Sequence, residues 1–89
     1  MKVALICKDK PGHLQTRIET REAHLAYAAE TGVTQMAGPM LDDGGRMCGS
    51  LIILNVADLA AAVEWAANDP YAKAGLFEDV MIREWKQVV

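Results

Sequence analysis

The 89-residue sequence has few of the residues that constrain small folds through disulfides, metal binding or a rigid backbone: it has two cysteines, two histidines and three prolines. Cys7 and Cys48 lie far apart and match no CxxC spacing, so we expect free thiols. Two histidines without a cysteine pair predict no metal site, and no cofactor motif is present. No apolar run approaches the ~20 residues of a membrane span, and the N-terminal run is too short for a signal peptide. We therefore expect a cytoplasmic protein without membrane contact.

The sequence also lacks a surplus of positive charge. Nine Lys and Arg residues against twelve Asp and Glu residues give a net charge of -3. Because neutralising phosphates requires excess cations, this balance argues against nucleic acid as a partner. Apolar residues make up 52% of the chain and charged residues 24%, which suits a folded globular protein. We expect one domain over residues 1–89.

Hydrophobic periodicity predicts four strands and two helices in the order β-α-β-β-α-β. We expect strands at residues 2–8, 34–40, 47–56 and 77–88, and helices at 13–30 and 59–67. Gly32 suits the left-handed end of the first helix, and Asp58 is a predicted N-cap of the second. Gly38 and Pro39 make the second strand short, bulged or an edge strand. This order is typical of an α+β ferredoxin-like fold, in which both helices cover one face of an antiparallel sheet.

Two of the predicted strands carry apolar residues on both faces. Residues 51–54 read Leu-Ile-Ile-Leu, and in the last strand Val80 and Ile82 alternate with Met81 and Trp85. Helices on one face of the sheet leave the other face uncovered, and an apolar patch of that size indicates a partner. The simplest partner is a second copy packed sheet against sheet, so we expect a homodimer.

The first predicted helix combines an apolar stripe with an unusual row of basic residues. At ~100° per residue, Leu14, Ile18 and Leu25 lie on one side, Arg21 falls within their stripe, and Arg17 and His24 follow its border. Two interpretations fit this row. The side chains could run their apolar parts along the protein surface with their polar ends in water, or they could belong to a functional site.

Asp69 has a similar ambiguity. As the residue before Pro70 it suits a helix N-cap. In a ferredoxin-like fold the two helices lie side by side, so Asp69 is also a candidate partner for His24. A carboxylate there would favour the imidazolium and select the ring tautomer, while Arg21 would oppose the added charge. Together these groups could make His24 a general base.

Other candidates carry weaker signals. Tyr71 could donate a hydrogen bond to a ligand or simply pack its ring, and Gly38-Pro39 could bring backbone close to a ligand or only kink a strand. Ser50 has no base at a recognisable spacing, which argues against a catalytic triad. Cys7 and Cys48 fall on adjacent predicted strands, where we expect two buried and unreactive thiols rather than a redox pair.

Several short segments together resemble the YCII-related (YciI-like) family. These are Arg21-Glu22-Ala23-His24-Leu25, Gly38-Pro39, Gly49 and, most specific, the segment from Asp69 to Gly75 that reads DPYAKAG. The resemblance spans nearly the whole chain. It implies a ferredoxin-like fold that pairs as a dimeric α/β barrel, and it implies that His24 and Asp69 match the His-Asp pair proposed as the family's active site.

The resemblance implies lyase-type chemistry on cyclic or halogenated small molecules. We accordingly expect a metal-free enzyme in which His24 abstracts a proton, Asp69 orients it and Arg21 holds the substrate's negative group. Tyr71, Gly38 and Pro39 are further candidates for substrate binding. Two alternatives stay open at this stage: a non-catalytic module that binds a small ligand, and a purely structural dimer module.

Overall fold

The computed structural model describes residues 1–89 and confirms the predicted order of elements, with one short helix added. The strands are β1 (Lys2–Asp9), β2 (Thr34–Leu41), β3 (Met47–Asn55) and β4 (Phe77–Glu84). The helices are α1 (Leu14–Thr31), α2 (Leu59–Asn68) and α3 (Pro70–Lys73). None of the helices is both long and apolar enough to cross a membrane.

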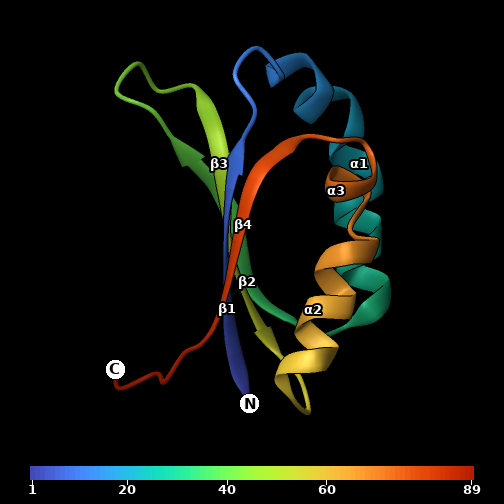
Figure 1. Cartoon of the computed structure of the whole chain (residues 1–89), viewed down its shortest axis with the longest axis vertical. Coiled ribbons are helices and arrows are strands. Elements are labelled where there is room, and N and C mark those ends of the chain that lie inside the picture. The colour runs from blue at the N-terminus through green and yellow to red at the C-terminus, as the bar shows by residue number, and fades with distance from the viewer.

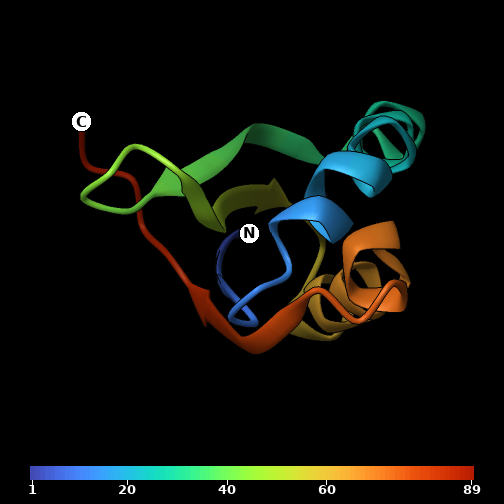
Figure 2. The same cartoon turned by 90° about the horizontal axis from the view of Figure 1, so that it is seen from above.

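The four strands form one antiparallel sheet in the order β2-β3-β1-β4, and all three helices lie against one face of it (Figure 1). This is the predicted ferredoxin-like α+β architecture. Seen from above, α1 lies on the β2 side of the sheet, and α2 and α3 lie on the β4 side (Figure 2). Strand β2 is an edge strand, as its Gly38-Pro39 step indicates, because proline cannot donate to a second neighbour.

The core lies between the sheet and the helices. Val3 and Leu5 of β1, Ile52 and Leu54 of β3 and Trp65 of α2 are buried there. These residues alternate along each strand with residues on the opposite face, as the pleat requires. On the face that points away from the helices, Ile53 is buried, whereas Ile6 and Leu51 stay substantially exposed.

Three predicted details at the ends of elements are confirmed. Gly32 ends α1 in a left-handed conformation, with φ of 66°, where a side chain would be strained. The Asp58 carboxylate accepts a hydrogen bond of 2.8 Å from the backbone N–H of Ala61 at the start of α2. The segment after Asp69 forms the single helical turn α3.

The orientation of α1 is not the one that its apolar stripe alone would give. Ile18 and Leu25 of the apolar stripe are 50% and 52% exposed, whereas Arg17 and His24 are buried. The helix therefore turns its border of polar residues, not its apolar stripe, toward the sheet. The physical reason is that both buried polar side chains have carboxylate partners, which offset the cost of removing them from water.

Two expectations are wrong. The last strand ends at Glu84 rather than Val88, because its neighbour β1 begins at Lys2; the bond from the Trp85 N–H to the Lys2 carbonyl is the last along this edge. Cys48 is exposed and only Cys7 is buried, so the expected pair of buried thiols is not formed.

Candidate active site

A buried histidine-carboxylate pair lies between the helices. His24 Nδ1 is 2.8 Å from Asp69 Oδ1, and the two side chains are 8% and 2% exposed. His24 comes from the buried side of α1, and Asp69 occupies the junction of α2 and α3, where its Oδ1 also accepts the backbone N–H of Tyr71 at 3.0 Å. Oδ1 of Asp69 therefore makes both contacts that the sequence suggested as alternatives: it caps α3 and it binds His24.

The tautomer of His24 follows from this contact. An ionised carboxylate has no proton to donate, so the Nδ1–H of the imidazole donates and Nε2 keeps its lone pair. Nε2 makes no hydrogen bond within the chain, and Thr34 Oγ1 is the only fully buried side-chain polar atom without a partner. Nε2 therefore remains accessible as a hydrogen-bond acceptor or base.

A second buried ion pair lies two turns earlier on α1. The Arg17 guanidinium binds Asp9 through Nε and Nη2, at 2.7 and 2.8 Å, and Nη2 also donates to Ser50 Oγ at 2.9 Å. Burial lowers the pKa of Arg17, but the hydrogen bond and charge of Asp9 outweigh it, so that the pKa is raised and the guanidinium stays charged. Because Ser50 Oγ accepts from Arg17, the serine hydroxyl hydrogen stays free to donate.

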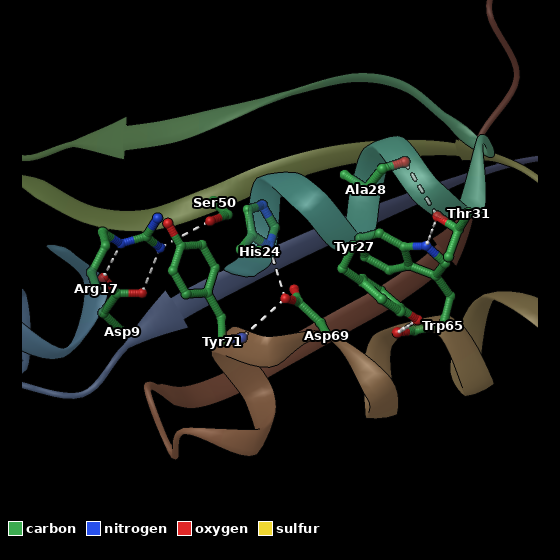
Figure 3. A network of polar contacts seen from close by, with 10 residues as sticks. All are labelled: Asp9, Arg17, His24, Tyr27, Ala28, Thr31, Ser50, Trp65, Asp69 and Tyr71. Atoms are coloured by element: carbon green, nitrogen blue, oxygen red, sulfur yellow. Dashed lines mark hydrogen bonds and ion pairs between the residues drawn. The ribbon is translucent and has the colours of Figure 1, made fainter. Parts of the chain in front are cut away.

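The aromatic ring of Tyr71 lies between these two pairs (Figure 3). The His24 and Tyr71 rings stack with centroids 4.1 Å apart and planes 18° apart, and Arg17 Cζ lies 4.7 Å from the Tyr71 centroid. Burial raises the pKa of the Tyr71 phenol, with the positive charge of Arg17 in opposition, so the phenol is neutral near pH 7.

A pocket of about 140 Å³ opens between α1 and strands β2 and β3. Helix α1 contributes Arg17, Arg21 and His24 to the lining, β2 contributes Gly38 and Pro39, and β3 contributes Ser50. Arg21 has no ion-pair partner and is exposed. The pocket thus combines a free imidazole nitrogen, a free hydroxyl donor and an unpaired cation.

The structure therefore brings the sequence-predicted residues to one place. Arg21, His24, Gly38, Pro39 and Tyr71 all line the pocket, and Asp69 lies behind His24.

Two features of the site were not predicted from the sequence: the role of Asp9 and the contact between Ser50 and Arg17. Asp9 is an acidic residue at the end of a strand, and no periodic pattern distinguishes it. Ser50 was considered only as a nucleophile beside a base, whereas its contact is the guanidinium of Arg17.

The thiols lie outside this arrangement. Burial raises the pKa of Cys7 from 9.0 to about 12, with the Asp69 charge adding to the effect, so this thiol stays protonated and unreactive at neutral pH. Cys48 is exposed and unpaired. We therefore assign neither cysteine to the pocket.

The chain is thus a compact α+β protein of ferredoxin-like fold, with a buried histidine-carboxylate pair beside a small pocket. It belongs to the YCII-related domain family, whose model matches residues 1–86. Protein YciI of Escherichia coli O6:H1 is 35% identical over 97 aligned positions, which cover 99% of both chains. A Haemophilus influenzae protein is 34% identical over the same share of both chains.

Two solved structures share this fold. The 5-chloro-2-hydroxyhydroquinone dehydrochlorinase TftG of Burkholderia phenoliruptrix AC1100, in complex with 2,5-dihydroxybenzoquinone, superposes with a TM-score of 0.89 at 35% identity. That match covers 99% of this chain and 96% of TftG. An antibiotic biosynthesis monooxygenase shares the fold at a TM-score of 0.62 and 13% identity, over 99% of this chain and 98% of the monooxygenase.

Proposed function

We propose that this protein is a small-molecule lyase that uses His24 as a general base to start an elimination. The observation that carries the proposal is the different surroundings of the two imidazole nitrogens of His24. Nδ1 is bound to the buried Asp69 carboxylate, and Nε2 has no partner and belongs to a residue that lines the pocket. A histidine held in this tautomer is ready to accept a proton from a bound molecule.

The elimination itself balances without a further reactant. For a chlorinated ring that carries hydroxyl groups, the keto tautomer places the chlorine on a saturated carbon. Nε2 of His24 takes the proton of a ring hydroxyl group, and the electron pair of that O–H bond forms a carbonyl. The adjoining ring double bond shifts toward the carbon that bears the chlorine, and chloride leaves that carbon with its bonding pair. The imidazolium formed is stabilised by the Asp69 carboxylate 2.8 Å from Nδ1 and later returns its proton to solvent.

The pocket favours a single oxygenated ring as substrate. Its volume of about 140 Å³ is close to the ~150 Å³ of an apolar cavity that holds one benzene molecule. Arg17 and Ser50 present hydrogen-bond donors on one side, and Arg21 adds a positive charge at the mouth, where an oxyanion forming next to the reacting carbon would be stabilised. Gly38 and Pro39 also line the pocket. The 35% identity to a dehydrochlorinase supports this substrate class.

A direct test follows the two products. The purified protein is incubated with 5-chloro-2-hydroxyhydroquinone, while chloride release and quinone absorbance are measured. We expect His24→Gln to lower the rate by about 10²–10⁴, the usual contribution of a general base. His13→Gln, which changes the only other histidine, serves as the matched control because His13 lies outside the pocket.

Each outcome of this test is informative. Equal rates in His24→Gln and the unaltered protein would overturn the assignment of the base. Saturable binding of 2,5-dihydroxybenzoquinone without turnover of any chlorinated ring would favour the ligand-binding module over the enzyme.

We also propose that the protein acts as a homodimer. On the face of the sheet away from the helices, Gly38, Leu51, Ile6 and Met81 are register neighbours in a row that crosses all four strands. Ile6, Leu51 and Met81 are 40–45% exposed, which supports burial of this face against a second copy.

Sedimentation at micromolar concentration should show a species near twice 9.7 kDa. Ile6→Glu should shift it toward the monomer, since it places a charge in the middle of the apolar row. The matched substitution Ile18→Glu, on the exposed side of α1, should not. A clean monomer of the unaltered protein would contradict the dimer.

A further inference from the structure

The contacts of Tyr71 suit the fixing of a neighbour better than the holding of a ligand. The residue lines the pocket, but only 3% of its surface is exposed. Its ring has His24 stacked on it, Arg17 over it and the edge of Phe77 against it, with ring centroids 6.0 Å apart in a T-shaped contact. Little of the aromatic surface is left for a bound molecule.

The geometry of α1 explains why one ring fits between Arg17 and His24. Residues seven positions apart lie two turns apart on the same side of a helix, about 10.5 Å along its axis at ~1.5 Å per residue. The distances from the Tyr71 centroid to Arg17 Cζ and to the His24 centroid are 4.7 and 4.1 Å. The space between the Arg17 and His24 side chains is therefore wide enough for one aromatic ring, and Figure 3 shows the Tyr71 ring in that position.

The same residue also fixes the other half of the dyad. The backbone N–H of Tyr71 donates to Asp69 Oδ1, the oxygen that contacts His24 Nδ1. One residue thus holds the carboxylate through its main chain and the imidazole through its side chain. The hydrogen bond to Asp69 restrains the imidazole at Nδ1, and the stacked phenol restrains the tilt of the ring plane.

We propose that Tyr71 is a positioning residue that sets the plane of the His24 ring and so aims Nε2 at the substrate. This role rests on the proposed function of His24 and adds to it. The ring of Tyr71 performs this role, and its hydroxyl group does not. The electron-rich face of the phenol also stabilises the imidazolium that forms when His24 accepts a proton. Arg17, the permanent cation near the same ring, is balanced by its bidentate contact with Asp9.

The test compares Tyr71→Phe, which keeps the stack, with Tyr71→Leu, which removes it. Residual dipolar couplings of the two ring C–H bonds report the orientation of the His24 plane whether or not the protein turns over a substrate. We expect Tyr71→Phe to keep the couplings of the unaltered protein and Tyr71→Leu to reduce them by motional averaging, while the Asp69 contact keeps the Nδ1–H tautomer in both variants. With 5-chloro-2-hydroxyhydroquinone, Tyr71→Leu should lose about 10- to 100-fold in kcat with little change in KM, the cost of a misplaced group. Tyr71→Phe should recover most of that loss.

Phe77→Leu is the matched control, because Phe77 contacts the Tyr71 ring at its edge. A similar loss of packing should leave the His24 signals and kcat unchanged. Should Tyr71→Leu fail to fold, the unaltered protein provides the decisive measurement. A ring stacked at 4.1 Å must shift the His24 carbon-bound protons upfield, and Tyr71→Phe must preserve that shift.

The results separate the alternatives. Unchanged couplings of the His24 ring and an unchanged kcat in Tyr71→Leu would overturn the positioning role. Equal losses in Tyr71→Phe and Tyr71→Leu, seen as a rise in KM, would instead assign the hydroxyl to substrate binding and overturn the proposal. If no variant turns over any substrate but the couplings of the His24 ring respond as expected, the proposed reaction fails and the positioning of His24 by Tyr71 stands.

Discussion

Removing the charge of Asp9 should destabilise the fold more than any surface charge change, although Asp9 is an ordinary acidic residue in the sequence. The Asp9 and Arg17 side chains are 6% and 3% exposed and are joined by two hydrogen bonds of 2.7 and 2.8 Å. Asp9→Asn keeps the shape of the side chain but leaves the guanidinium as a buried cation without a counter-charge. Breaking a buried pair in this way costs roughly 3–5 kcal/mol.

The structure places the expected value at the lower end of that range. Arg17 keeps its hydrogen bond to Ser50 and lines an open pocket, so that water can partly solvate the uncompensated charge. We therefore expect Asp9→Asn to lower the free energy of unfolding by about 3 kcal/mol. Because buried pairs are weakly screened, the loss should persist in 1 M NaCl.

Urea unfolding at one fixed protein concentration measures this loss. The matched control is Glu78→Gln, which breaks the exposed Lys8–Glu78 pair at 3.9 Å and should change stability by less than about 1 kcal/mol. The double change Asp9→Leu with Arg17→Met should recover most of the stability, because it removes both buried charges together. A loss in Asp9→Asn no larger than that in Glu78→Gln would refute the reasoning.

Two further predictions concern close packing and the buried thiol. A Cβ at Gly49 would overlap the carbonyl oxygen of Cys7. Gly49→Ala should therefore lower the free energy of unfolding in urea by about 1–3 kcal/mol. A Cβ at Gly38 meets open space, so Gly38→Ala should lower it far less. Burial raises the pKa of Cys7 from 9.0 to about 12, so above pH 9 the unfolded chain releases a proton that the folded chain keeps. Stability should therefore fall by up to about 1.4 kcal/mol per pH unit between pH 9 and 12. Cys7→Ala should remove that part of the slope, and an equal slope in both proteins would contradict the burial effect.

Most of the fold could be predicted because each strand carries its own local signal. The apolar run of β3 and the Asp58 and Gly32 boundary residues depend on neighbours within a few positions, and the structure confirms them. The end of β4 could not be found in this way. It depends on where the neighbouring strand β1 begins, at Lys2, which is a tertiary fact rather than a property of residues 85–88.

The candidate site was accessible to sequence reasoning only in part. The predicted fold makes Asp69 a candidate partner for His24 and the family resemblance implies the pair, but their 2.8 Å contact is a matter of tertiary structure. The orientation of α1 does not follow from its apolar stripe. The rule that the apolar side of a helix faces the core fails where polar side chains have buried partners. In this chain the partners are Asp9 and Asp69, which lie 8 and 45 residues from the side chains they bind.

The burial of Arg17 and His24 links the position of α1 to the chemistry of the site. Both carboxylate partners lie at the ends of elements, Asp9 as the last residue of β1 and Asp69 between α2 and α3. The two contacts therefore fix α1 against the sheet and against the helical layer at points two turns apart. An apolar interface in the same place would hold the helix as well or better, since buried ion pairs rarely add net stability. It would leave no charged or hydrogen-bonding group facing the pocket. The proposed role of the pocket in binding a substrate accounts for the polar side of α1, and the exposed Ile18 and Leu25 are the consequence of turning that side inward.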